Sequence, residues 1–132
     1  MTAVCTYCSA EKSAAPGRIP ALQRYRSRRI SDLAATAAGA GDDFLILSGS
    51  YGLITPETPL PWYDHLLQAR EVPELADRAA GTLAARKIGR VVYHTADPGL
   101  EPDVRPYLDV IRLACAKTGV PLEIVILPGT PV

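Results

Sequence analysis

One segment of the chain gathers most of the side chains that can do chemistry. Residues 48–64, SGSYGLITPETPLPWYD, follow a short apolar run and are stiffened by three prolines. A carboxylate such as Asp64 can orient a water molecule or balance a developing positive charge. Aromatic rings such as Trp62 and Tyr63 can stack on a flat ligand. We therefore predict that Asp64 and Tyr63 are catalytic and that Trp62 binds substrate.

The turn at the start of this segment suits close contact between a ligand and the main chain. Gly49 and Gly52 can adopt backbone conformations closed to other residues, and successive amides in such a turn can bind an anion or the edge of a base. The same composition also fits a proline-rich crossover whose Trp62 and Tyr63 only cover a sheet edge. The substrate-binding residues predicted for this turn are Ser48, Gly49, Ser50, Tyr51 and Gly52.

A second polar segment follows the first predicted strand. It contains Tyr7, Cys8, Ser9 and Lys12, and we predict that all four bind substrate. Cys5 and Cys8 have the spacing of a metal or redox pair, but no second pair exists, so a small core residue followed by a thiol at the mouth of the site is favoured. The chain has no Rossmann glycine motif, Walker loop or serine elbow. We expect no metal and no cofactor.

The arginines form one basic cluster at the start of a predicted helix. Arg24 and Arg28 share a face of such a helix, near the positive end of its dipole, and we predict that they bind a phosphate of the substrate. A solvated surface is the more common fate of such a run. His94 ends a later strand and is a candidate acid, base or hydrogen-bond donor, so we predict that it is catalytic. A histidine that bonds only backbone fits that position equally well.

Strands and helices alternate along the chain, as apolar runs and helical spacing indicate. The strands are expected at residues 3–8, 43–48, 90–95 and 121–127. The helices are expected at residues 20–39, 72–89 and 100–119. This order predicts one α/β domain over residues 1–132, with three α/β/α layers and a four-stranded parallel sheet. Ligands of such sheets sit beyond the carboxyl ends of the strands, where both polar segments and His94 lie.

Composition limits the class of protein. The 132 residues carry 14 basic and 14 acidic side chains, so the formal net charge is zero. No overall field draws the chain to nucleic acid or to a membrane, and no apolar run reaches the roughly 18 residues of a membrane span. Three cysteines without a signal peptide favour a reducing compartment. We expect a cytoplasmic protein with no membrane partner.

The first half of the chain resembles a bacterial domain of unknown function. Members of that family read as a Cys and a Lys after the first strand, a Pro-Ala and a Leu-Tyr entering the first helix, and then LSAKYGLL followed by PYD. The matching parts of this chain are CSAEKS, IPALQRYRSRRI and LSGSYGLITPETPLPWYD. The last motif is similar to one in the YaaA peroxide-stress family and to a domain of archaeal tRNA-guanine modification enzymes. Both resemble the uracil-DNA glycosylase fold, a small parallel α/β sandwich.

The resemblance also implies site residues and shows two departures. Ser50 stands where the relatives commonly have Lys, which removes a positive charge from a shared phosphate or nucleic-acid contact. Trp62 stands where they have Pro. Carried over position by position, the marked residues are Cys8, Lys12, Ser48, Tyr51, Gly52, Pro56, Tyr63 and Asp64.

These observations predict an enzyme that acts on a nucleobase, nucleoside or nucleotide and cleaves or exchanges an N-glycosidic bond, as a hydrolase or transferase. Two alternatives stay open. One is a non-catalytic nucleic-acid-binding domain of a stress or nucleic-acid modification system. The other is a small-ligand sensor or subunit that borrows its active site from a partner. The alanine-rich face of the 72–89 helix suits close packing in a homodimer. Convergence of Asp64, His94 and Tyr7 in one pocket lined by Trp62 would favour the enzyme.

Overall fold

A five-stranded sheet forms the centre of the structure, a computed structural model that describes residues 1–129. Its order is β4-β3-β1-β6-β7. β1 pairs in parallel with β3 and β6, and β6 pairs in parallel with β7, whereas β4 runs antiparallel to β3. The strands are β1 (Thr2–Tyr7), β3 (Asp43–Ser48), β4 (Gly52–Ile54), β6 (Arg90–Thr95) and β7 (Leu122–Ile126).

The prediction of four strands is wrong because the turn after β3 leads into a fifth. Gly52 has φ +77°, a left-handed conformation that returns the chain beside β3. Leu53 then pairs with Leu47, and both side chains are buried. A three-residue strand is too short to give a recognisable alternation of apolar and polar residues, so the sequence pattern indicated only a turn.

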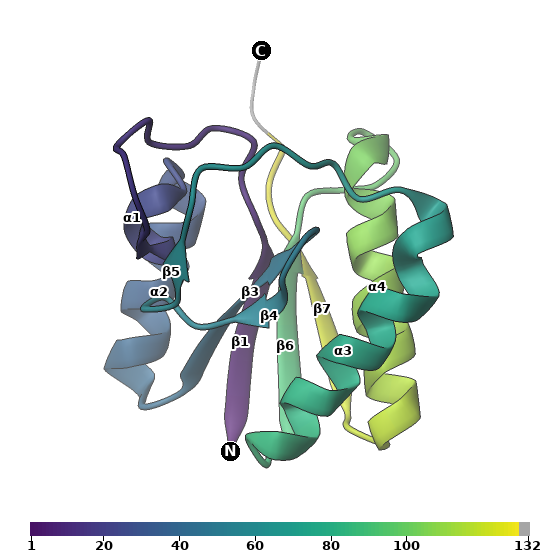
Figure 1. The fold of residues 1–132 in the computed structure, drawn as a ribbon. Helices are drawn as coiled ribbons and strands as arrows, with labels where there is room; N and C mark the ends of the chain where they lie inside the picture. Colours follow the sequence, from purple (N-terminus) through teal and green to yellow (C-terminus); the bar gives the residue numbers. More distant parts are fainter. Residues whose placement is uncertain (130–132) are drawn as a thin grey trace.

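Helices cover both faces of this α/β sheet (Figure 1). α2 (Arg28–Ala40) packs on β1 and β3, whereas α3 (Val72–Ala85) and α4 (Arg105–Thr118) pack together on the opposite face. The 3-10 turns η1 (Ala69–Glu71) and η2 (Pro102–Val104) lead into α3 and α4. α3 and α4 therefore lie close to the helices predicted at residues 72–89 and 100–119, whereas the helix predicted at residues 20–39 differs.

The helix expected at residues 20–39 is broken into two. α1 (Ala21–Arg24) ends where Tyr25 adopts an extended conformation and pairs with Lys12. Ser27 then begins α2, because its hydroxyl accepts a hydrogen bond from the backbone N–H of Ile30 at 3.2 Å. The break rotates the arginines relative to one another, so the prediction that Arg24 and Arg28 share a helix face is wrong.

Apolar side chains on both sides of the sheet form a buried cluster. Leu45, Ile46 and Leu47 of β3 are completely buried, which agrees with a strand covered on both faces. Ala76 and Ala79, whose small side chains suggested a dimer surface on the 72–89 helix, are also completely buried within the chain. The homodimer stays a prediction.

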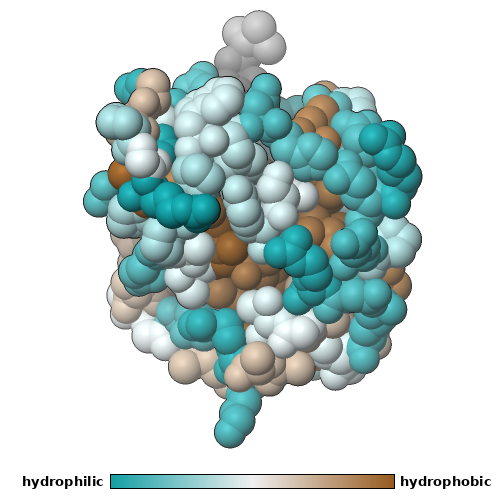
Figure 2. Space-filling model, viewed as in Figure 1, coloured by the Kyte–Doolittle hydropathy of each residue, from teal (hydrophilic) through white to brown (hydrophobic). Residues whose placement is uncertain are grey.

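The loops above the sheet determine where a ligand can approach. β2 (Ile19–Pro20) and β5 (Pro59–Leu60) form a two-stranded ribbon, and the segment 61–68 then crosses above the carboxyl ends of the strands toward α3 (Figure 1). Figure 2, drawn in the same view, shows that hydrophilic side chains cover most of the face turned toward the reader, with a small hydrophobic group near its centre.

β1 lies at the point where the strand order reverses. The chain passes from β1 to β3 on one side and later enters β6 on the other. In open α/β sheets, ligands bind beyond the carboxyl ends of the strands at such a reversal. The end of β1, where Tyr7 and Cys8 lie, is therefore the place expected for a site.

Candidate functional site

A cavity of about 200 Å³ lies at the carboxyl end of β1. We call it the carboxyl-edge cavity. Five of the predicted site residues line it: Tyr7, Cys8, Ser9, Lys12 and Asp64. Four polar residues with no predicted role also line it: His65, Glu101, Asp103 and Tyr107. The cavity thus joins the two polar segments with the beginning of α4.

Two tyrosines form an aromatic wall of this cavity. The rings of Tyr7 and Tyr107 lie 6.2 Å apart, centroid to centroid, with planes inclined at 46°. The Tyr107 hydroxyl accepts a hydrogen bond from the backbone N–H of Leu67 at 3.2 Å, and the Cys8 thiol lies 3.8 Å from the same oxygen. Burial is the main cause that raises the pKa of Tyr107. Its hydroxyl is therefore neutral at physiological pH.

The side chain of Tyr63 is hydrogen-bonded at the turn after β3. The hydroxyls of Ser48 and Tyr63 lie 2.8 Å apart, and Ser48 Oγ also accepts hydrogen bonds from the backbone N–H groups of Ser50 and Tyr51 at 3.2 and 3.1 Å. The Tyr63 hydroxyl is hydrogen-bonded to that of Tyr25 as well. These contacts tie the 61–68 segment to the end of β3. They give Tyr63 a clear structural role.

Lys12 lies between this tyrosine cluster and the carboxyl-edge cavity. Its Nζ is 4.7 Å from the ring centroid of Tyr63 and 5.9 Å from that of Tyr25. An ammonium group over aromatic rings is attracted by their electron-rich faces. Lys12 therefore packs on the cluster while it still lines the cavity.

Residue 49 has no room for a side chain, which explains the glycine at this position. A Cβ atom at this position would lie 3.1 Å from the Tyr107 hydroxyl oxygen and 3.3 Å from His65 Cδ2. Any side chain at residue 49 would therefore push against two residues that line the carboxyl-edge cavity. Gly49 also lines the neighbouring cavity beside α3, and its predicted contact with substrate stays a prediction.

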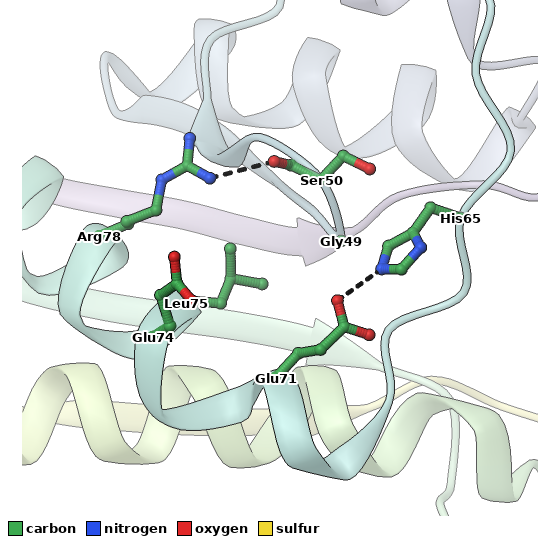
Figure 3. A pocket seen from close by; sticks show the side chains of 7 residues that line it. All are labelled: Gly49, Ser50, His65, Glu71, Glu74, Leu75 and Arg78. Atoms are coloured by element: carbon green, nitrogen blue, oxygen red, sulfur yellow. Dashed lines mark hydrogen bonds and ion pairs between the residues drawn. The ribbon is translucent and has the colours of Figure 1, made fainter.

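A second cavity of about 340 Å³ lies on the other side of the 61–68 segment, beside α3 (Figure 3). His65 also lines this cavity, and its Nε2 lies 2.7 Å from Oε2 of Glu71. Arg78 donates hydrogen bonds to the backbone carbonyls of Ser50 and Tyr51 at 3.1 and 3.3 Å, which ties α3 to the turn after β3. His65 is thus shared between the two cavities.

Arg29 lies at the end of β1, in a third cavity of about 680 Å³. Its guanidinium stacks 3.7 Å from the ring centroid of Tyr7. It donates hydrogen bonds to Thr6 Oγ1 and to the carbonyls of Tyr7 and Cys8 at 2.6, 2.7 and 3.2 Å. Tyr7 and Glu101 line both this cavity and the carboxyl-edge cavity.

The two arginines predicted to bind a phosphate lie elsewhere. Arg24 is completely buried and donates only to backbone carbonyls. Arg28 is exposed at the first turn of α2. Arg29 is the arginine that reaches the carboxyl edge, because the helix begins at residue 28 rather than at residue 20. Sequence spacing along one continuous helix could not reveal this.

His94 and Trp62 do not join the predicted cluster. Trp62 is 58% exposed, and neither residue lines any of the three cavities. His94 is half-buried, and burial lowers the pKa of its imidazole. Its Nδ1 is buried and has no hydrogen-bond partner among the described residues. Asp64 and Tyr7 therefore converge in one cavity, without His94 and Trp62.

Two classes of feature are missing from the part of the chain that the structure describes. Residues 1–129 contain no group of three His, Cys, Asp or Glu side chains placed to hold a metal ion. Within the same residues, no helix is both long enough and apolar enough to cross a membrane.

Comparisons with known proteins give no match: no family model, no curated protein and no solved structure is similar to the chain. The resemblance to the peroxide-stress family and to the glycosylase fold therefore stays a prediction from the 47–64 motif.

Some of the residues in the cavity gave no signal in the sequence. Tyr107 stands in a helix more than forty residues from Asp64 along the chain, and nothing in its neighbours distinguishes it from a core aromatic residue. Glu101 lies in the loop that follows β6. The rule that ligands bind beyond the carboxyl ends of strands was the one guide that pointed to its segment.

Proposed function

We propose that the protein is an enzyme that handles a nucleobase, nucleoside or nucleotide and cleaves or exchanges an N-glycosidic bond. The observation that supports this proposal best is the convergence of Asp64 with the Tyr7–Tyr107 wall in one cavity at the reversal of strand order. A glycosylase-like fold belongs to the same proposal. It rests on the 47–64 motif and on the mainly parallel α/β sheet.

The lining of the cavity suits a flat ligand with N–H and O–H groups. Tyrosine rings pack well against a planar base. The carboxylates of Asp64, Glu101 and Asp103 can accept hydrogen bonds from a base edge or from sugar hydroxyls. When the bond between sugar and base breaks, positive charge develops on the sugar, and a nearby carboxylate such as Asp64 stabilises it.

The charge of the lining favours a small ligand over a nucleic-acid strand. Asp64, Glu101 and Asp103 stand against a single cation, Lys12, in the carboxyl-edge cavity. Phosphate groups are attracted by clusters of Lys and Arg and are repelled by carboxylates. A neutral base or nucleoside therefore fits this cavity better than a polyanion.

The test is a base-release assay on purified protein with nucleosides, nucleotides and short nucleic acids as substrates. We expect release from at least one substrate and a loss of about 10²- to 10⁴-fold in rate for Asp64→Asn, the range typical of a positioned catalytic group. Asp42→Asn is the matched control, since Asp42 precedes β3 at the opposite edge of the sheet. We expect the control to keep the wild-type rate.

Two results would contradict the proposal. One is the absence of base release from every substrate tested. The other is an Asp64→Asn variant as active as the wild type. Binding of tRNA or DNA that weakens steeply with salt, without any release of base, would instead support a non-catalytic nucleic-acid-binding domain.

A further inference from the structure

His65 lies between two cavities and is held in one orientation. It lines the carboxyl-edge cavity and the neighbouring cavity beside α3. Figure 3 shows its imidazole and the Glu71 carboxylate pointing toward each other, with His65 Nε2 2.7 Å from Glu71 Oε2. The ring also packs against Gly49, because its Cδ2 lies 3.3 Å from the position that a Cβ of residue 49 would take. A bond on one side and packing on another therefore position the imidazole.

Glu71 is itself anchored and ionised. Its Oε1 accepts a hydrogen bond from the backbone N–H of Gln68 at 3.0 Å, in a capping box at the start of η1. That backbone hydrogen bond is the largest influence that lowers the pKa of the Glu71 carboxyl, and His65 adds to it. An ionised carboxylate only accepts hydrogen bonds. Nε2 of His65 must therefore carry the proton of this contact.

The tautomer follows from this contact. In a neutral imidazole that is protonated at Nε2, Nδ1 holds a lone pair and is the basic nitrogen. Within residues 1–129, no hydrogen bond to Nδ1 of His65 is present. This is the arrangement of a general base oriented by a carboxylate, in which one nitrogen is fixed and the other is left to react.

We propose that His65, oriented by Glu71, is the general base of the carboxyl-edge cavity. This inference rests on the function proposed above. In hydrolysis, Nδ1 takes a proton from a water molecule as the water oxygen bonds to the anomeric carbon. The carbon–nitrogen bond breaks, and its electron pair leaves with the base. The base takes a proton from solvent, and His65 gives its proton back to solvent. Water and the N-glycoside are thus converted to the free sugar and the free base.

In this proposal Asp64 and His65 have different roles. Asp64 stabilises the positive charge on the sugar, and His65 activates the nucleophile. In a transfer reaction, a hydroxyl of the acceptor takes the place of water. The charged and titratable groups that line the two cavities together with His65 are Tyr7, Cys8, Lys12, Asp64, Glu71, Glu74, Arg78, Glu101, Asp103 and Tyr107.

The first test compares three variants in the base-release assay. We expect His65→Gln to lower the rate by about 10²- to 10⁴-fold, as for the loss of a general base. Glu71→Gln should cost less than His65→Gln, because the imidazole stays in place but loses the carboxylate that orients it. Glu74→Gln is the control, because Glu74 lines only the cavity beside α3. It should keep the wild-type rate.

The second test does not depend on activity. The chain has two histidines, so a His94→Gln background leaves the ¹⁵N signals of His65 alone. We expect the signals of an Nε2-protonated imidazole in this background. We expect this preference to be lost when Glu71→Gln is added.

The outcomes separate the two proposals. An active wild type whose rate survives in His65→Gln would overturn this inference and leave the proposed function standing. An imidazole protonated at Nδ1 in the ¹⁵N spectra would also overturn it, whatever the activity. A wild-type protein without base release would overturn the proposed function, and the role of His65 with it.

Discussion

Arg24 shows how a single charged residue can organise a loop. Its side chain is completely buried, and it donates hydrogen bonds to the carbonyls of Ser13, Ala15, Gly17 and Leu60 at 2.7 to 3.2 Å. Hydrogen bonds from a charged donor to buried acceptors are among the strong ones in proteins. Arg24 therefore ties the segment after β1 to β5, on the side of the molecule that carries Lys12.

We predict that Arg24→Met lowers the free energy of unfolding by about 3–5 kcal/mol, since it leaves several buried carbonyls without donors. The matched variant Arg28→Met changes an exposed residue of α2. It should stay within about 0.5 kcal/mol of wild type. Urea denaturation followed by circular dichroism measures both. Equal effects of the two substitutions would show that Arg24 has no such role.

At the scale of elements, the hairpin of β3 and β4 prepares the site. The turn between them holds the hydroxyl contacts of Ser48 and Tyr63, and Arg78 of α3 fastens the same turn from the other side. Gly52 makes the return of the chain feasible, with φ +77°. β4 therefore helps to position the 61–68 segment over the cavity, because it holds the turn that this segment contacts.

We predict opposite signs for the same substitution at two glycines. Gly52→Ala should lower the free energy of unfolding by about 1–2 kcal/mol, because a Cβ disfavours positive φ. Gly81 lies inside α3, and a Cβ there would meet no atom within 4 Å. Gly81→Ala should raise the free energy by about 0.5–1 kcal/mol. Urea midpoints compare the two, and a stabilised Gly52→Ala would contradict the turn geometry.

At the scale of the whole molecule, tyrosine hydroxyls are concentrated in the interior. Burial is the main cause that raises the pKa of each of five tyrosines: Tyr7, Tyr25, Tyr63, Tyr93 and Tyr107. The folded chain therefore holds these protons more tightly than the unfolded chain does. Their contribution to stability is fully present below the pKa of an unfolded tyrosine, about 10, and is lost as the pH rises above it.

We predict that the free energy of unfolding falls steadily above about pH 10, with a slope that approaches 1.4 kcal/mol per pH unit for each tyrosine that ionises only on unfolding. Urea denaturation at a series of alkaline pH values, with tyrosinate absorbance as a second signal, measures the slope. Tyr63→Phe should make the slope shallower. A stability that is flat between about pH 9 and 11 would contradict the prediction.

The sequence by itself was sufficient for most of the regular elements, although it did not show β4 or the break between α1 and α2. The alternation of apolar runs and helical segments predicted the four parallel strands and the helices at 72–89 and 100–119, because side-chain periodicity and terminal glycines or prolines act on neighbouring residues. The same reasoning placed Tyr7, Cys8, Lys12 and Asp64 at the carboxyl edge, where all four line one cavity. These features depend on short stretches of chain.

Only the tertiary structure decided which side chains meet. Tyr25 left the predicted helix because its ring packs near Tyr63 and its backbone pairs with Lys12, contacts between segments far apart in the chain. For the same reason Arg29 reached the end of β1 while Arg24 was buried. His65 was paired with Glu71, and His94 was left outside the cavity. Packing between distant elements sets these contacts, and no local pattern encodes it.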